Sequence, residues 1–281
     1  MRYFRSFVFL TFLLGLIINS CSSHDTLKET IIINQNWTFK NISDSIWMPA
    51  DVPGTVHTDL INNNIIEDPY YRLNERNVQW VDKTDWEYRS SFFVGNNLLS
   101  KDVIELRLNG IDTHSDIYIN GNKVIETNNM FTKWIVDCKK YLKYGKNSIK
   151  VILRSAINIG LDKRAKLGFT LPGAENDQSE IGGLGDTKVC VFSRKPGYHF
   201  GWDWGPRLVT SGIWQNIELV AWNLANIDNI YIKQNKIDTE IADLEFTVEI
   251  ESVNKKNITL ITLIDDSIIN SRKINLIPGF N

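Results

Sequence analysis

This sequence has almost no net charge. Its 31 Lys and Arg residues nearly balance its 33 Asp and Glu residues, for a formal net charge of −2 at pH 7. The basic residues are scattered among the acidic ones, so they form neither the positive patch that binds nucleic acid nor the polybasic cluster that binds an anionic membrane surface. The composition therefore excludes nucleic acid as an expected partner and favours a neutral ligand.

Cysteine is also scarce, with three residues in the whole chain. Cys138 and Cys190 have a spacing that matches no metal site, and the chain is too long to need a disulfide framework. We expect buried thiols, with a single bridge in an oxidising compartment as the alternative. The histidines His57, His114 and His199 lie far apart without a ligand spacing. Neither a metal nor another cofactor is expected.

Long apolar runs are absent except near the start of the chain, at residues 7–18. This run follows two arginines and is too short to span a bilayer comfortably, which takes roughly 20 residues. We interpret residues 1–21 as an export signal. Small residues around Cys21 resemble a lipobox, so Cys21 is expected to become lipidated. The alternative is an ordinary signal peptide in which Cys21 is incidental.

With Cys21 lipidated, the protein would be an exported bacterial lipoprotein of the periplasm or outer membrane. The lipid at Cys21 would attach it to the membrane, and residues 22–28 would form a polar tether.

The rest of the chain has the patterns of short strands and almost none of a helix. Apolar and polar residues alternate over 104–109 and again over 149–154, which is the period of a half-buried strand. Asn120-Gly121 lies between two such runs and predicts a type I′ hairpin turn. A single short helix is expected near 55–63. These features predict an all-β protein built as an antiparallel sandwich.

A second β unit is expected after residue 222. Residues 244–250 alternate cleanly between apolar and polar, and 258–264 and 268–276 can each add a strand. An immunoglobulin-like sandwich needs about seven strands and roughly 100 residues. Residues 223–281 therefore correspond to a partial, incomplete immunoglobulin-like β-sandwich.

The densest group of aromatic residues is a Trp-Asp-Trp sequence, Trp202, Asp203 and Trp204. Sugar sites combine such groups, because an aromatic ring covers the C–H face of a pyranose while a carboxylate accepts hydrogen bonds from its hydroxyls. Gly201 and Gly205 flank the sequence and indicate a shaped loop. We therefore expect at least one of the three to contact a ligand. The competing interpretation is that both tryptophans belong to the core.

Three motifs together resemble a known family. The Pro-Gly-Thr-Val-His stretch at 53–57, the Asp-Pro-Tyr-Tyr-Arg stretch at 68–72 and the Trp-Asp-Trp-Gly-Pro-Arg stretch at 202–207 resemble β-mannosidases of glycoside hydrolase family 2, in order and spacing. Between them, 108–112 and 117–121 resemble that family's sugar-binding jelly roll. The resemblance covers residues 30–222. The stretch 194–198 departs modestly from the usual sequence of the family.

The resemblance implies an enzyme in which a jelly roll, here 29–222, and an immunoglobulin-like domain precede a catalytic (β/α)₈ barrel. Both catalytic carboxylates of such retaining enzymes, roughly 5 to 5.5 Å apart, belong to the barrel. A barrel takes at least about 200 residues and is absent from this chain. No catalytic residue is assigned. Asn74-Glu75 is expected to be a loop or interdomain contact, and Asp68 and Arg72 are expected to be structural.

The substrate-binding residues implied by the resemblance are Trp202, Asp203 and Trp204, with His199 beside them. The first hypothesis is an amino-terminal fragment of an exo-acting retaining β-mannosidase, which hydrolyses terminal non-reducing β-mannose. Its partners would be β-mannoside glycans and its own missing barrel, and the chain alone would be inactive. The alternatives are a free-standing, lipid-anchored carbohydrate-binding module and a structural accessory domain that binds another protein.

Replacing Cys21 with Ala tests the expected lipid anchor. Without the thiol no lipid can be attached, so the variant should move from the membrane fraction to the soluble fraction. Membrane partition and incorporation of labelled fatty acid check this together. An unlabelled parent that partitions as the variant does would contradict lipidation.

Overall fold

The computed structural model describes residues 28–172 and 177–281. The predicted export signal at 1–21, its Cys21 and almost all of the tether at 22–28 lie outside these residues. Among the helices that are described, none is both long and apolar enough to cross a membrane.

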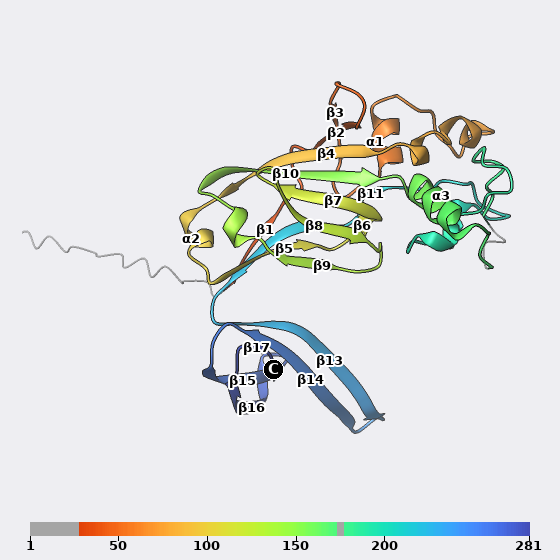
Figure 1. Cartoon of the computed structure of the whole chain (residues 1–281). Helices are drawn as coiled ribbons and strands as arrows, with labels where there is room; N and C mark the ends of the chain where they lie inside the picture. Colours follow the sequence, from red (N-terminus) through yellow and green to blue (C-terminus); the bar gives the residue numbers. More distant parts are fainter. Residues whose placement is uncertain (1–27, 173–176) are drawn as a thin grey trace, which may run out of the picture.

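Two antiparallel sheets face each other in the first and larger part of the chain (Figure 1). The smaller sheet has the strand order β1 (Lys28–Ile32), β12 (Ile217–Trp222), β5 (Val103–Leu108) and β9 (Trp134–Asp137). The larger has the order β3 (Met48–Pro49), β2 (Thr38–Asn41), β4 (Trp86–Val94), β10 (Gly145–Arg154), β7 (His114–Ile119) and β8 (Asn122–Asn128). The predicted all-β jelly-roll sandwich is confirmed.

Alternation of apolar and polar residues determines which side of each strand faces the core. Along β4 every second residue is buried, namely Trp86, Tyr88, Ser90, Phe92 and Val94, whereas the residues that alternate with them are exposed or half-buried. β10 pairs with the whole length of β4, from Gly145 opposite Val94 to Leu153 opposite Trp86. A one-residue slip would turn these apolar side chains to the outside, so the pattern fixes the register.

Short elements complete the sandwich and its loops. β6 (Ile111–Asp112) pairs with β11 (Gly212–Ile213). The remaining helices are one-turn or short segments: α1 (Val56–Asn62), α2 (Asn96–Leu99), η1 (Asn74–Val78), η2 (Val81–Lys83), η3 (Lys139–Tyr141), η4 (Cys190–Phe192) and η5 (Gly197–Phe200).

Two local predictions are confirmed. Asn120 and Gly121 both have positive φ, 49° and 83°, at the turn between β7 and β8. The predicted helix is α1, which Thr55 begins with a capping box: its side chain accepts from the backbone N–H of Thr58, whose hydroxyl accepts from the backbone N–H of Thr55. The turn and the helix start each depend on a few neighbouring residues, so both can be predicted from the sequence alone.

The expectation of a single helix is wrong, because α3 (Ala156–Leu167) spans 12 residues at one end of the sandwich (Figure 1). Ser155 caps its start and Gly168, at φ 85°, ends it. Only Ala156, Ile157 and Gly160 are buried, so α3 lacks the apolar stripe by which a surface helix is usually recognised.

Both cysteines that the structure describes are free thiols. Cys138 is buried and Cys190 is half-buried. Burial is the first cause that raises their pKa values, to about 12 and about 11. The expected thiols are therefore present, without the alternative bridge.

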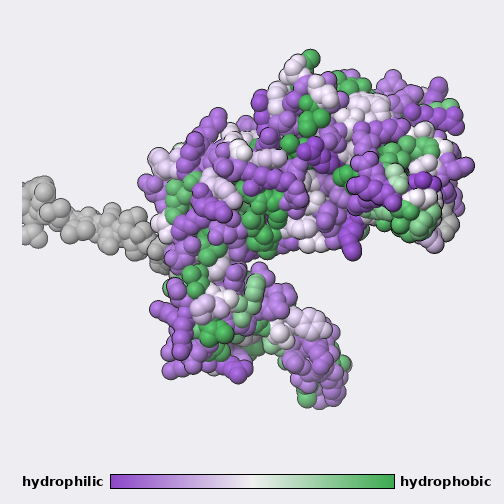
Figure 2. All heavy atoms as spheres, viewed as in Figure 1, coloured by the Kyte–Doolittle hydropathy of each residue, from purple (hydrophilic) through white to green (hydrophobic). Residues whose placement is uncertain are grey.

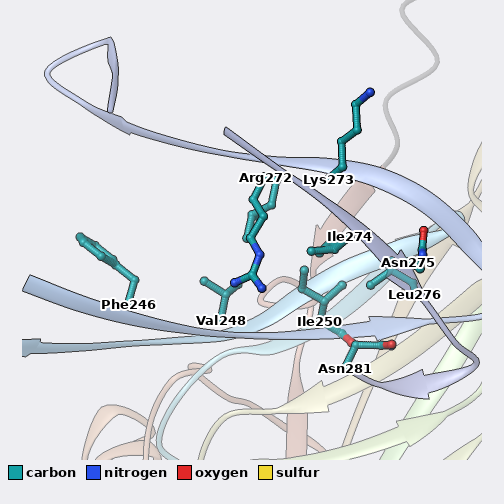
Figure 3. A pocket seen from close by; sticks show the side chains of 10 residues that line it. Phe246, Val248, Ile250, Arg272, Lys273, Ile274, Asn275, Leu276 and Asn281 are labelled. Carbon is teal, nitrogen blue, oxygen red and sulfur yellow. The ribbon is translucent and has the colours of Figure 1, made fainter. Parts of the chain in front are cut away.

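After β12 the chain forms a separate lobe of strands, visible below the sandwich in Figures 1 and 2. β14 (Ala242–Ser252) pairs with β13 (Ala225–Ile237) and β17 (Gly279–Phe280), and β15 (Lys256–Ile264) pairs with β16 (Ser267–Leu276). Val248 and Ile250 of β14 face Ile274 and Leu276 of β16 (Figure 3). These residues line a space of about 520 Å³.

A buried ion pair joins the loops at the α3 end of the sandwich. Arg207 is completely buried, and its Nη1 donates to the carboxylate of Asp82 and the amide oxygen of Gln79. Its backbone is held as well: its N–H donates to Glu75 Oε1 at 2.6 Å, and its carbonyl accepts from Gln79 Nε2 at 2.8 Å. A Cβ on Gly182 would lie 2.6 Å from Arg207 Cζ. Three distant segments therefore meet at one guanidinium group.

Replacing Arg207 with Met should lower the free energy of unfolding by about 3–5 kcal/mol, because the buried Asp82 carboxylate then has no counter-ion. Urea denaturation of the full chain measures this. The double variant Arg207→Met and Asp82→Asn removes both charges and should recover part of the loss. A single variant within about 0.5 kcal/mol of the parent would show that the pair does not hold the loops.

Candidate sugar-binding site

Two motifs that are far apart in the sequence line one hollow of about 380 Å³ at the α3 end of the sandwich. We call it the Trp-Asp-Trp hollow. Its lining comes from the Asp-Pro-Tyr-Tyr-Arg stretch, the 178–181 loop and the Trp-Asp-Trp loop: Pro69, Tyr70, Arg72, Glu75, Gln178, Ile181, Trp202, Asp203, Trp204, Gly205 and Pro206. Three of the four substrate-binding residues expected from the sequence therefore lie together.

Gln178 and a glycine give the Trp-Asp-Trp loop its shape. The backbone N–H of Gln178 donates to the carbonyl of Phe200 at 2.9 Å, and its side-chain Nε2 donates to the carbonyl of Trp202 at 3.1 Å. Gly201 has φ 105°, and a Cβ there would lie 2.5 Å from Gln178 Oε1. Only glycine fits that conformation and that contact. The loop then turns, with Gly205 N–H donating to the carbonyl of Trp202 at 3.3 Å.

The two tryptophans of the loop differ in exposure. Their ring centroids are 5.0 Å apart with the planes inclined at 59°. Trp204 is 80% exposed, whereas Trp202 is half-buried and its buried Nε1 has no hydrogen-bond partner. Asp203, between them, is exposed. Trp204 is thus not a core residue, and the loop presents an indole and a carboxylate to the outside.

The Asp-Pro-Tyr-Tyr-Arg stretch lines the rest of the same open face. Asp68 Oδ1 accepts from the backbone N–H of Tyr70 at 2.9 Å, and Tyr70 is itself 74% exposed. The Arg72 guanidinium lies 5.1 Å from the ring centroid of Tyr71. In the part of the chain that is described, Asp68 and Arg72 form no ion pair with each other. Asp68 shapes the turn, and Arg72 lines the hollow.

Asn74-Glu75, which we expected to be a loop or an interdomain contact, begins the short helix η1, and Glu75 is bound to the backbone next to the Trp-Asp-Trp loop. Its Oε1 accepts from the backbone N–H of Arg207, which follows Pro206. A carboxylate tied to a backbone donor in this way fixes the end of the Trp-Asp-Trp loop. Glu75 therefore holds the Trp-Asp-Trp loop against η1.

His199 lies behind the loop and is not one of the residues that line the hollow. Its Nδ1 is 3.1 Å from Thr210 Oγ1, which donates to Asp112 Oδ2 at 2.7 Å. Lys195 Nζ, fully buried, donates to Asp112 Oδ1 at 2.9 Å. Burial first, and then the charge of Lys195, lower the pKa of His199 to about 4. At pH 7 a neutral His199 supports the loop from inside.

Among the lining residues that the sequence did not single out for this site are Tyr70, Gln178 and Ile181. Tyr70 belongs to a recognised motif, so its place in the chain was a usable signal. Gln178 and Ile181 belong to no recognised motif. The hydrogen bonds of Gln178 to Phe200 and Trp202 cross more than 20 residues of chain, which no local pattern reports.

The chemistry offered by the hollow is that of binding. An exposed indole and a phenol ring can cover the C–H faces of a sugar, and the Asp203 carboxylate and the Arg72 guanidinium can hydrogen-bond its hydroxyls. Within residues 28–172 and 177–281, no group of three or more His, Cys, Asp or Glu side chains is arranged to hold a metal ion.

Comparison with known proteins agrees with this geometry. A family described as "Glycosyl hydrolase 2 galactose-binding domain-like" matches residues 37–215. Beta-mannosidase of Mus musculus is 32% identical over 197 residues, which are 70% of this chain and 22% of the relative. Beta-mannosidase B of Aspergillus terreus is 32% identical over 221 residues, 76% of this chain and 25% of the relative. The chain thus spans about a quarter of the length of these relatives.

Solved structures give the same result. The crystal structure of a beta-D-mannosidase from Dictyoglomus thermophilum matches with a TM-score of 0.76 and 36% identity, over 90% of this chain and 30% of that one. An exo-chitosanase from Amycolatopsis orientalis, at 19% identity and a TM-score of 0.64, shares the fold. No (β/α)₈ barrel is present in the described part of this chain. The chain belongs to glycoside hydrolase family 2, as the amino-terminal galactose-binding-like domain found in relatives named β-mannosidase.

Proposed function

We propose that this chain forms one wall of the mannose subsite of an exo-acting, retaining β-mannosidase. The observation that carries the proposal is the Trp-Asp-Trp hollow, which is lined by the exposed side chains of Trp204, Asp203 and Tyr70. The names of the relatives support the choice of β-mannoside as the substrate.

A hollow with one wall binds a monosaccharide weakly. Ligand sites usually bury most of the ligand surface, whereas Trp204 is 80% exposed and nothing in the described residues covers it from the opposite side. We therefore expect a dissociation constant for mannose in the millimolar range, or about 4 kcal/mol of binding free energy. A second wall, supplied by a catalytic barrel, would complete the subsite.

Hydrolysis with retention needs two carboxyl groups roughly 5 to 5.5 Å apart, one as nucleophile and one as general acid/base. Glu75, the other carboxylate that lines the hollow, is already bound to the backbone of Arg207. We propose that the catalytic pair belongs to a barrel outside this chain and that the chain alone does not hydrolyse β-mannosides. Export and a lipid anchor at Cys21 are part of the same proposal.

Substitution of Asp203 tests the role of the hollow in catalysis. Residues 28–281 are joined to the remaining domains of the Dictyoglomus thermophilum β-mannosidase, and Asp203→Ala is compared with the parent. Hydrogen bonds to sugar hydroxyls that strengthen in the distorted transition state contribute several kcal/mol. We expect kcat/KM for an aryl β-mannoside to fall at least about 100-fold, or roughly 2.7 kcal/mol.

The control is Asp162→Ala, which removes an exposed carboxylate from α3, outside the hollow. It should leave kcat/KM unchanged. If Asp203→Ala stays within about twofold of the parent while the enzyme remains folded, Asp203 is part of the scaffold and the assignment is wrong.

A further inference from the structure

A second hollow, of about 470 Å³, lies on the sandwich and shares no lining residue with the Trp-Asp-Trp hollow. Six residues line it: Pro53, Asn109, Lys133, Trp214, Gln215 and Asn216. We call it the Trp214 hollow. Its residues come from the segment before α1, the end of β5, the start of β9 and the connection between β11 and β12, so the fold brings four segments together there.

Backbone hydrogen bonds make this hollow a rigid feature. The N–H of Trp214 donates to the carbonyl of Gly110 at 3.1 Å, and the N–H of Asn109 donates to the carbonyl of Asn216 at 3.2 Å. These hydrogen bonds hold the connection between β11 and β12 against Asn109 and Gly110. The preceding residue, Ile213, accepts from the N–H of Gly54 at 2.8 Å, which fixes the neighbouring Pro53 segment.

Glycine allows the indole of Trp214 to lie directly on the backbone. A Cβ on Gly110 would lie 2.7 Å from both Cε2 and Nε1 of Trp214, closer than such atoms approach. One side of the indole is thus packed against the Gly110 turn, and the residue is half-buried. A tryptophan held in this way is a fixed apolar surface at the hollow, with little conformational freedom left to lose on binding.

The polar side chains around Trp214 have no hydrogen-bond or ion-pair partner in the described part of the chain. These side chains are those of Asn109, Lys133, Gln215 and Asn216. Asn147 behaves differently: its amide donates to the carbonyls of Lys143 and Gly145. Amides that shape a turn are engaged in this way, whereas those at the Trp214 hollow are available to a ligand.

The residue types indicate the chemistry of that ligand. Three amides offer both donors and acceptors, and Lys133 offers a donor, a set that matches neighbouring hydroxyl groups. No carboxylate lines the hollow, so the residues that line it carry no negative charge. The flat indole complements the C–H face of a pyranose.

We propose that the Trp214 hollow binds a neutral oligosaccharide, as a glycan site separate from the Trp-Asp-Trp hollow. The site needs neither Asp203 nor Trp204, so it does not depend on the function proposed above. A site of this kind would hold a glycan on the surface of the protein while another sugar unit occupies the first hollow.

Saturation-transfer NMR on the full chain tests this proposal with mannotriose and cellotriose as the probes. The background variant is Asp203→Ala with Trp204→Ala, which disables the Trp-Asp-Trp hollow. We expect at least one trisaccharide still to bind to it. Adding Gln215→Ala and Asn216→Ala, two half-buried side chains without hydrogen bonds, should then weaken the remaining binding at least tenfold.

Near-ultraviolet circular dichroism confirms that each variant is folded. Loss of all binding in the background variant, or remaining binding that Gln215→Ala and Asn216→Ala leave unchanged, would overturn the proposal. A separate result reports on the first hollow: binding by the parent that Asp203→Ala and Trp204→Ala do not reduce at all would contradict the proposed function of that hollow and not of this one.

Discussion

The loops that form the Trp-Asp-Trp hollow depend on one buried guanidinium group. Arg207 is fully inside the protein, where an unpaired charge is very costly, so Asp82 and Gln79 must stay in contact with it. Burial raises the pKa of Asp82, and the charge of Arg207 opposes that shift. Because Glu75 also holds the backbone of Arg207, the segment leading into it cannot move independently of η1 and η2.

This arrangement divides the Trp-Asp-Trp-Gly-Pro-Arg sequence into two parts. Its last residue is the internal anchor, and its first three residues reach the surface as a turn. Gly201 and Gln178 set the direction of that turn. A buried charge that holds an exposed binding loop is consistent with the general rule that sites need support from the residues behind them. His199 and the Asp112–Lys195 pair add further support from the inside.

The fold was predictable where its signals are local. Alternation at 104–109 and 149–154 gives β5 and β10, Asn120-Gly121 gives the hairpin, and Thr55 begins α1. α3 was missed because its buried residues do not form a stripe. In the site, the aromatic loop was predictable from its composition. Tyr70 and Trp204 line the same hollow although more than 100 residues separate them, and His199 points inward. Both features follow from tertiary packing that no local pattern contains.

The lobe after β12 leaves more of its large apolar side chains exposed than the sandwich does. Ile250 and Leu276 are buried, whereas many large apolar residues of β13 to β16 are exposed, among them Ile230, Ile232 and Ile268. The sandwich, by contrast, buries the inward-facing apolar side chains of its two sheets in one core cluster. The hollows that bear on sugar binding both lie on the sandwich, so its stability is what their geometry depends on.

The most direct test of the account is whether a mannoside contacts the Trp-Asp-Trp loop of this chain. Methyl β-D-mannopyranoside is titrated into the full chain, and the indole N–H resonances are followed by NMR after assignment with tryptophan variants. We predict that the resonances of Trp202 and Trp204 shift together and saturate with a dissociation constant in the millimolar range, as expected for a hollow with one wall. Constant resonances of both residues up to about 100 mM ligand, well above that range, in a folded chain would contradict the account.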